Sequence, residues 1–83
     1  MKALKFYATW CGPCKGLSMV IKGAEDKITV PIEEYDIDTC GSLSAQWNVR
    51  SVPTMILVND SGAEVARKVG TMNEAELLNF LKG

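Results

Sequence analysis

Two cysteines separated by a glycine and a proline, Cys11 and Cys14, are the residues of this chain best suited to chemistry. On a helix, side chains three positions apart have Cβ atoms about 5–6 Å apart, near the separation that a disulfide requires. At a helix start, Cys11 would face unpaired backbone N–H groups and the positive end of the helix dipole, which favour the thiolate. The spacing therefore predicts thiol–disulfide exchange, with Cys11 as the nucleophile and the more shielded Cys14 as the resolving thiol.

Two alternative interpretations give the Cys11 and Cys14 thiols a role other than redox chemistry. A zinc site needs about four Cys or His ligands, whereas the chain has three cysteines and no histidine. Two buried, inert thiols are the second alternative, which the Gly-Pro insert and a strand-to-helix junction disfavour. The third cysteine, Cys40, is interpreted as a bystander or a partly buried small residue, with a regulatory or intermolecular disulfide as the alternative. The lack of histidine excludes Ser-His and Cys-His catalysis within the chain.

Length and composition point to a single domain spanning residues 1–83. The chain is 47% hydrophobic, and nine Lys and Arg against ten Asp and Glu leave a formal net charge of −1. Nucleic-acid and anionic-membrane partners both need a clustered positive surface, so we expect neither. We find no apolar run near the ~20 residues of a membrane span, and no secretory signal after Met1. The expected location is the cytoplasm.

The elements that must hold the dithiol follow from hydrophobic periodicity and turn residues. Pro31 lacks an N–H for a strand ladder and predicts that the second strand lies at a sheet edge. Residues 54–58 are continuously apolar, as in a strand covered on both faces, and Arg67 and Lys68 suggest that the last strand forms the opposite edge. A right-handed crossover makes the first two strands parallel. The predicted order is β-α-β-α-β-β-α, with strands at 2–8, 29–37, 54–58 and 63–69 and helices at 11–27, 42–48 and after 73.

Helix caps support two of these assignments. Asn73 precedes Glu76 by three residues, as in a capping box, and Met72 and Leu77 have the spacing of a hydrophobic staple. For the short helix at 42–48, the candidate N-caps are Ser42 and Ser44.

Several segments together resemble the thioredoxin family, over roughly residues 2–82. Val52-Pro53-Thr54 resembles the family's cis-proline segment, and Asp36-Ile37-Asp38 and Arg50 fall at matching spacing. The remaining matches are the active-site motif Trp10-Cys11-Gly12-Pro13-Cys14-Lys15 and the turn Val69-Gly70-Thr71.

The resemblance implies a thioredoxin-like α/β fold, with a four-stranded mixed sheet and three helices. It also implies a monomeric protein-disulfide reductase that has no bound cofactor and is recycled by a thioredoxin reductase. A cis peptide bond before Pro53 would place the backbone of Val52 beside Cys11, where an extended segment of a disulfide-containing protein substrate could pair. Trp10 is interpreted as facing substrate, with ordinary partial burial as the alternative. Further residues around this contact would be Gly12, Pro13, Gly70 and Thr71.

The chain departs from the family pattern in three places. It lacks the strand and helix that usually precede the active-site strand, so it resembles a shortened thioredoxin with the element count of glutaredoxin. Met19 replaces a proline that usually kinks the active-site helix, which we expect to be straighter. Lys5 replaces a buried Asp that accepts a proton in the family.

Lys5 is matched by an acidic residue, Glu34, where the family often has a Lys. We hypothesise that the pair is swapped and lies behind the disulfide, so that Glu34, or water held by it, receives the proton of Cys14. The alternative is that the stem of Lys5 lies on apolar surface with its ammonium group in water.

Two other functions fit parts of the sequence. The length suits a glutaredoxin-like enzyme that uses glutathione, but the expected Gly-Gly pair followed by an acidic residue is replaced by Gly70-Thr71-Met72. A non-redox binding module could use the same face of the fold, although the intact Cys11 and Cys14 argue against it.

Overall fold

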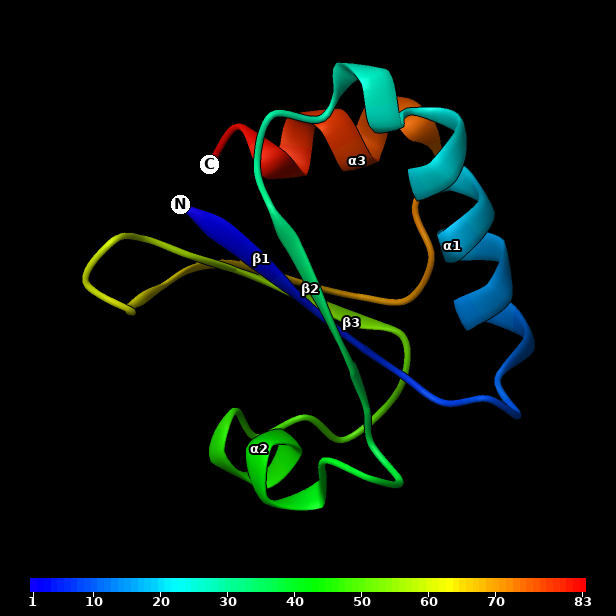
Figure 1. The fold of residues 1–83 in the computed structure, drawn as a ribbon, viewed down its shortest axis with the longest axis vertical. Coiled ribbons are helices and arrows are strands. Elements are labelled where there is room, and N and C mark those ends of the chain that lie inside the picture. The colour runs from blue at the N-terminus through cyan, green and yellow to red at the C-terminus, as the bar shows by residue number, and fades with distance from the viewer.

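The computed structural model describes residues 1–83. Its elements follow the predicted β-α-β-α-β-β-α order, with one additional turn of 3-10 helix (Figure 1). The strands are β1 (Lys2–Tyr7), β2 (Ile32–Asp36), β3 (Thr54–Val58) and β4 (Glu64–Val69). The helices are α1 (Gly12–Gly23), the 3-10 turn η1 (Glu25–Lys27), α2 (Gly41–Gln46) and α3 (Glu74–Leu81).

The strands form one mixed sheet in the order β2-β1-β3-β4. β1 is parallel to β2 and antiparallel to β3, and β3 and β4 form an antiparallel hairpin. The predicted edges are confirmed, but the strand expected over 29–37 covers only Ile32–Asp36, so Pro31 precedes the strand and does not lie inside it. β2 begins directly after Pro31, whose carbonyl accepts a 2.8 Å hydrogen bond from Ala3 N. Every residue of the inner strand β3 is buried, as its continuous apolar sequence predicts.

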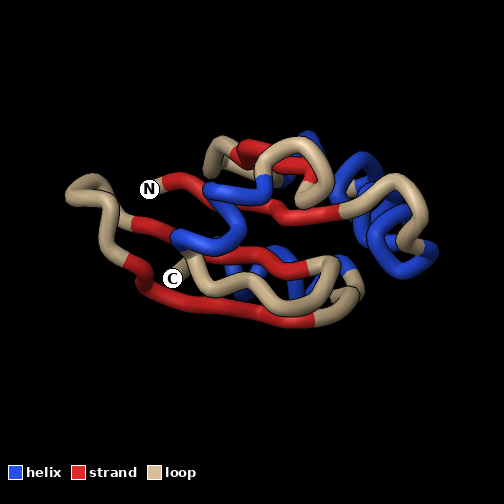
Figure 2. Tube along the Cα trace, turned by 90° about the horizontal axis from the view of Figure 1, so that it is seen from below, coloured by secondary structure: helices blue, strands red, loops and turns tan.

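Helices cover both faces of the sheet. On one face, α1 and α3 enclose a cluster that includes Leu17, Met55 and Leu77. On the other face, Phe6 and Ile56 belong to a second cluster, against which the α2 segment packs. Figure 1 shows the strands between α2 on one side and α1 and α3 on the other, and Figure 2 shows the strands side by side. Side chains that alternate along β1 therefore point to different helices, which decides what lies near the dithiol.

The structure corrects two helix boundaries. The helix expected over 11–27 ends at Gly23, and the buried Ala24, whose N–H bonds to the carbonyls of Val20 and Ile21, turns the chain into η1. The short helix α2 begins at Gly41, one residue before its expected start.

The expected serine caps of α2 are wrong. Cys40 occupies the N-cap position and makes no side-chain capping hydrogen bond. Ser42 and Ser44 lie inside the helix, where the hydroxyl of Ser44 donates to the carbonyl of Gly41 at 2.9 Å. Serine hydroxyls also form hydrogen bonds with backbone carbonyls one turn earlier in a helix. The presence of a serine therefore did not by itself identify the N-cap residue.

The capping box at α3 is confirmed. The backbone N–H of Glu76 donates to Asn73 Oδ1 at 2.8 Å, and the backbone N–H of Asn73 donates to Glu76 Oε1 at 3.0 Å. Met72 and Leu77, the expected staple, are both buried in the same core cluster. No helix of the structure combines the length and apolar character needed to cross a lipid bilayer.

Candidate active site

The dithiol lies where β1 passes into α1, as the sequence predicts. Cys11 is the N-cap of α1, and its Sγ accepts a hydrogen bond from the backbone N–H of Cys14 at 3.1 Å. Pro13 occupies the first turn, where a backbone N–H has no intrahelical partner in any case. The two cysteines form a disulfide with a Cα–Cα distance of 5.3 Å, within the ordinary range. The N–H that contacts Cys11 Sγ would stabilise the same atom as a thiolate after reduction.

The sulfur atoms are shielded from solvent. Cys11 and Cys14 are both buried and pack with Ala8 in a small cluster, against which Tyr7 and Val52 lie. No group of three or more His, Cys, Asp and Glu side chains occurs with metal-binding geometry. Cys40, the third cysteine, is half-buried and unpaired before α2. The structure thus joins the two predicted sulfur atoms with each other and not with a third ligand.

The loop before β3 brings backbone groups to Cys11. The Val52–Pro53 peptide bond is cis, as the resemblance implies, and the carbonyl oxygen of Val52 lies 3.7 Å from Cys11 Sγ. Gly70 N donates to the carbonyl of Pro53 at 2.8 Å, which joins the turn after β4 to this loop. Gly70 has a φ of +96°, a conformation that glycine adopts without steric cost. Val52, Pro53 and Gly70 therefore meet beside the dithiol.

Exposed residues surround this contact. Trp10 is 68% exposed, and its ring is held by a hydrogen bond from Nε1 to Asp38 Oδ2 at 3.1 Å. Trp10 is therefore mostly open to solvent and available for contact with another molecule. Gly12 and Pro13, in the first turn of α1, and Thr71, which follows Gly70, are also exposed.

Lys5 and Glu34 lie side by side. They are paired positions in the parallel register of β1 and β2, and Lys5 Nζ is 2.9 Å from Glu34 Oε1. The Lys5 side chain is 1% exposed, whereas that of Glu34 is 55% exposed. The alternative in which the Lys5 ammonium reaches water is therefore wrong. An unpaired buried ammonium would cost several kcal/mol, so the ion pair is what makes this burial tolerable.

Ser18 is a third member of this group, and it was not predicted from the sequence. Lys5 Nζ also donates to Ser18 Oγ on α1, and it lies 5.5 Å from the centroid of the Tyr7 ring. Ser18 and Cys14 line a pocket of about 270 Å³ together with Tyr7, Ala8, Thr9 and Lys15. The available signal was the spacing, because Ser18 follows Cys14 by four residues and shares its helix face.

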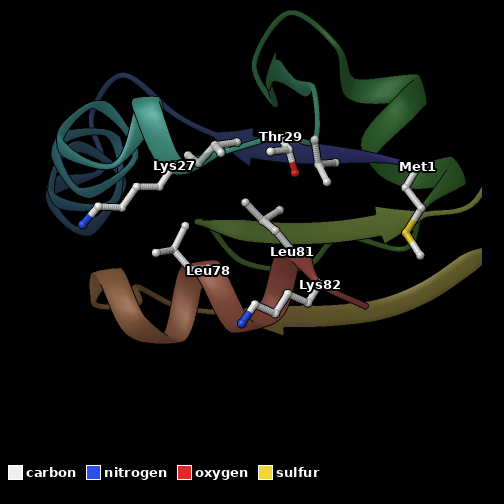
Figure 3. Close-up of a pocket in the computed structure, with 8 residues that line it drawn as sticks. Met1, Lys27, Thr29, Leu78, Leu81 and Lys82 are labelled. Atoms are coloured by element: carbon white, nitrogen blue, oxygen red, sulfur yellow. The ribbon is translucent and has the colours of Figure 1, made fainter.

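The largest cavity lies away from the dithiol. It has a volume of about 470 Å³ and contains none of the cysteines among its lining residues. Figure 3 shows Leu78 and Leu81 of α3 on one side of it and Thr29, which precedes β2, on the other. The pocket that includes a cysteine of the dithiol is therefore not this cavity but the smaller one of about 270 Å³ beside Cys14.

Comparisons with known proteins agree with this geometry. The family model described as Thioredoxin matches residues 2–83. A thioredoxin from Mycolicibacterium smegmatis is 44% identical over 80 residues, covering 92% of this chain and 70% of that protein. A bifunctional thioredoxin reductase/thioredoxin from Mycobacterium leprae is 38% identical over 78 residues, covering 92% of this chain and 17% of that protein.

A solved structure shows the same fold. A mutant thioredoxin from Halobacterium salinarum NRC-1 superimposes with a TM-score of 0.88 at 32% identity, covering 96% of this chain and 70% of that chain. Neither the glutaredoxin-like alternative nor the non-redox module is needed to account for these matches and the paired cysteines. The chain belongs to the thioredoxin family, and its Cys11–Cys14 pair makes it a thiol–disulfide oxidoreductase.

Proposed function

We propose that this protein reduces disulfides of other proteins, with Cys11 as the attacking thiolate. The observation that carries the proposal is the position of Cys11 Sγ. It caps α1, receives the N–H of Cys14 and lies beside the carbonyl of Val52. A sulfur at a helix N-terminus has a lowered pKa because backbone N–H groups and the helix dipole stabilise its anion.

The reaction consists of two successive thiol–disulfide exchanges. The Cys11 thiolate attacks one sulfur of the substrate disulfide, the substrate S–S bond breaks, and the released substrate sulfur takes up a proton. Cys14 then loses its proton, and its thiolate attacks the sulfur of Cys11. The bond between Cys11 and substrate breaks, the second substrate sulfur is protonated, and the Cys11–Cys14 disulfide remains. Two electrons have passed from the protein to the substrate.

An extended substrate segment would pair with the backbone of Val52, next to Pro53. Such a segment needs backbone groups close to the attacking sulfur, and the loop before β3 places the carbonyl of Val52 3.7 Å from Cys11 Sγ. Trp10, which is rigidly held and exposed, would contact the substrate on one side. The other proposed contact residues are Gly12, Pro13, Gly70 and Thr71.

Lys5 and Glu34 form the proposed proton-transfer group. Glu34 is half-exposed and carries the carboxylate nearest to the buried Lys5. Lys5 reaches Ser18, which lines the pocket that also contains Cys14. Glu34, or water that it holds, would accept the proton from Cys14 before the second exchange.

Further expectations belong to this proposal. Residues 1–83 act as one domain, which the single sheet and the match over residues 2–83 support, and the protein acts as a monomer. A thioredoxin reductase returns the disulfide to the dithiol, and the fused reductase and thioredoxin of the Mycobacterium leprae relative support that partnership. The protein acts in the cytoplasm and carries no bound cofactor, because the two sulfur atoms themselves transfer the electrons.

The decisive assay measures reduction of insulin disulfides, first with dithiothreitol and then coupled to a thioredoxin reductase or to glutathione and its reductase. We expect turnover with dithiothreitol and with thioredoxin reductase, and its loss in both Cys11→Ser and Cys14→Ser. Cys40→Ser is the matched control and should retain activity. Turnover in the glutathione-coupled assay alone would establish the glutaredoxin-like alternative. A protein inactive in every arm would contradict the reductase proposal.

A further inference from the structure

We propose that Ser18 and Lys5 act together as hydrogen-bond donors that stabilise the thiolate of Cys14 in the reduced protein. The inference rests on the proposed function, because Cys14 must attack as a thiolate in the second exchange. It adds Ser18 to the reaction machinery and gives the buried Lys5 a role distinct from holding Glu34. Lys5 is a positioning residue that polarises Ser18 and also adds the field of its own charge, whereas the Ser18 hydroxyl would contact the reacting sulfur.

The position of Ser18 on α1 is the first argument. Ser18 follows Cys14 by four residues, so the two side chains lie on one helix face with Cβ atoms about 5–6 Å apart. Both line the pocket of about 270 Å³. Ser18 is an exposed residue of α1, and in the proposed arrangement its hydroxyl turns its proton toward the Cys14 sulfur once the disulfide has opened.

The contacts of Lys5 are the second argument. Lys5 Nζ donates to Ser18 Oγ and to Glu34 Oε1, so the serine oxygen is engaged as an acceptor by a cation. This leaves the hydroxyl proton of Ser18 available for another acceptor. A hydroxyl whose oxygen accepts a hydrogen bond from an ammonium group becomes a better O–H donor, because successive hydrogen bonds polarise one another. The chain Lys5 Nζ–H, Ser18 Oγ–H and Cys14 sulfur therefore ends on the atom that becomes negative.

The charges around the pocket favour the thiolate. From β1 the groups are Lys5 and the phenol of Tyr7, from α1 Lys15, and from β2 the carboxylate of Glu34. Glu34 and Lys15 are exposed, so water and salt screen their fields. Lys5 is almost wholly buried, and its charge acts through a poorly screening interior. Lys5 is therefore the least screened cation near this pocket, and the Glu34 carboxylate, 2.9 Å from its Nζ, offsets part of its charge.

In the second exchange this arrangement would hold the Cys14 thiolate ready for attack. Its electron pair forms the new bond to the Cys11 sulfur while the bond from Cys11 to substrate breaks. The substrate leaves as a thiolate and takes a proton from water. Ser18 and Lys5 keep their own protons throughout, so they lower the free energy of the thiolate without being consumed.

The test measures the pKa of Cys14 directly. In Cys11→Ser/Cys40→Ser protein, Cys14 is the one remaining thiol, and its ultraviolet thiolate absorbance is followed against pH. In this background Lys5→Met should raise the pKa of Cys14 by about one unit, as loss of a nearby opposite charge does. Ser18→Ala should raise it by a smaller amount, and Ser18→Thr, which keeps the hydroxyl, should restore it. Lys22→Met removes a charge from the exposed last turn of α1 and should leave it unchanged.

Several outcomes would overturn the proposal. One is an unchanged pKa in both Lys5→Met and Ser18→Ala, and another is an equal shift in Ser18→Ala and Ser18→Thr. If Lys22→Met raised the pKa of Cys14 as much as Lys5→Met does, the overall charge of the protein, and not the contact of Lys5 with Ser18, would explain the shift. Should Lys5→Met fail to fold, the alanine and threonine variants of Ser18 decide alone. If the unmodified protein does not reduce insulin, the proposed function is contradicted, but the pKa of Cys14 can still be compared among these variants.

Discussion

Lys5 and Glu34 face each other across the parallel pairing of β1 and β2 and form an ion pair of 2.9 Å. One member is buried and the other is half-exposed, so the pair reaches from the interior to the solvent-exposed edge of the sheet. The arrangement follows from two features of the sheet. Lys5 points toward α1, and β2 is an edge strand, which leaves Glu34 open to solvent.

Replacing Glu34 with Gln should alter the pH dependence of thiol–disulfide exchange. If the carboxylate accepts the Cys14 proton, the rate of the second exchange below the thiol pKa should fall by about tenfold or more. The rate should recover as pH rises, because Cys14 then ionises without help. Stopped-flow mixing with a mixed-disulfide substrate over a range of pH checks this.

Glu33→Gln is the matched control for that experiment. It makes the same change one residue earlier on β2, where the carboxylate contacts Lys2 and Tyr35 and not Lys5. Its rate profile should match that of the unmodified protein. A Glu34→Gln profile that also matches would remove Glu34 from the mechanism.

The buried stem of Lys5 should matter more for stability than its charge. Lys5→Met keeps most of the side-chain volume, so we expect the free energy of unfolding to change by less than about 1.5 kcal/mol. Lys5→Ala also leaves a cavity and should cost about 2–4 kcal/mol. Urea unfolding of the oxidised protein measures both. Equal losses in the two variants would show that the ion pair, and not packing, stabilises this part of the fold.

Gly70 should tolerate alanine poorly although there is room for the methyl group. A Cβ at this position would meet no atom within 4 Å, but the φ of +96° is strained for any L residue. Gly70→Ala should therefore lower the free energy of unfolding by about 1–2 kcal/mol. Gly16→Ala, in α1 and equally unobstructed, should instead raise it by about 0.5–1 kcal/mol. Changes of the same sign in both would contradict the backbone argument.

Tyr35 should hold the carboxyl pKa of Glu33, also on β2, below its ordinary value. The hydroxyl of Tyr35 donates to Glu33 Oε1 at 2.7 Å and lowers the pKa of Glu33, with a further contribution from Lys2. A lowered carboxyl pKa stabilises the fold above the unfolded value of about 4.3, and that stability is lost as pH falls through the folded pKa. Tyr35→Phe should raise the pKa of Glu33 toward its ordinary value in an NMR titration. Tyr7→Phe, on the other face of the sheet, should not change it.

The sequence alone predicted the elements whose causes are local. The cysteine spacing, the α3 capping box and the apolar run of β3 each depend on residues within a few positions of one another. Pro31 predicted an edge strand for the same reason, since a missing N–H is a property of one residue. The α2 cap was wrong because Ser42 and Ser44 can satisfy backbone groups inside a helix as well as at its start.

Only the tertiary structure decided which groups meet at Lys5, next to the pocket that Ser18 and Cys14 line. Lys5, Ser18 and Glu34 come from β1, α1 and β2, and their contact depends on strand register and on the face of the sheet that α1 covers. A register change of one residue would turn the carboxylate to the opposite face. The sequence suggested the partnership of Lys5 and Glu34 but left open whether the ammonium group was buried, because burial is a property of the packed layers and not of the residue.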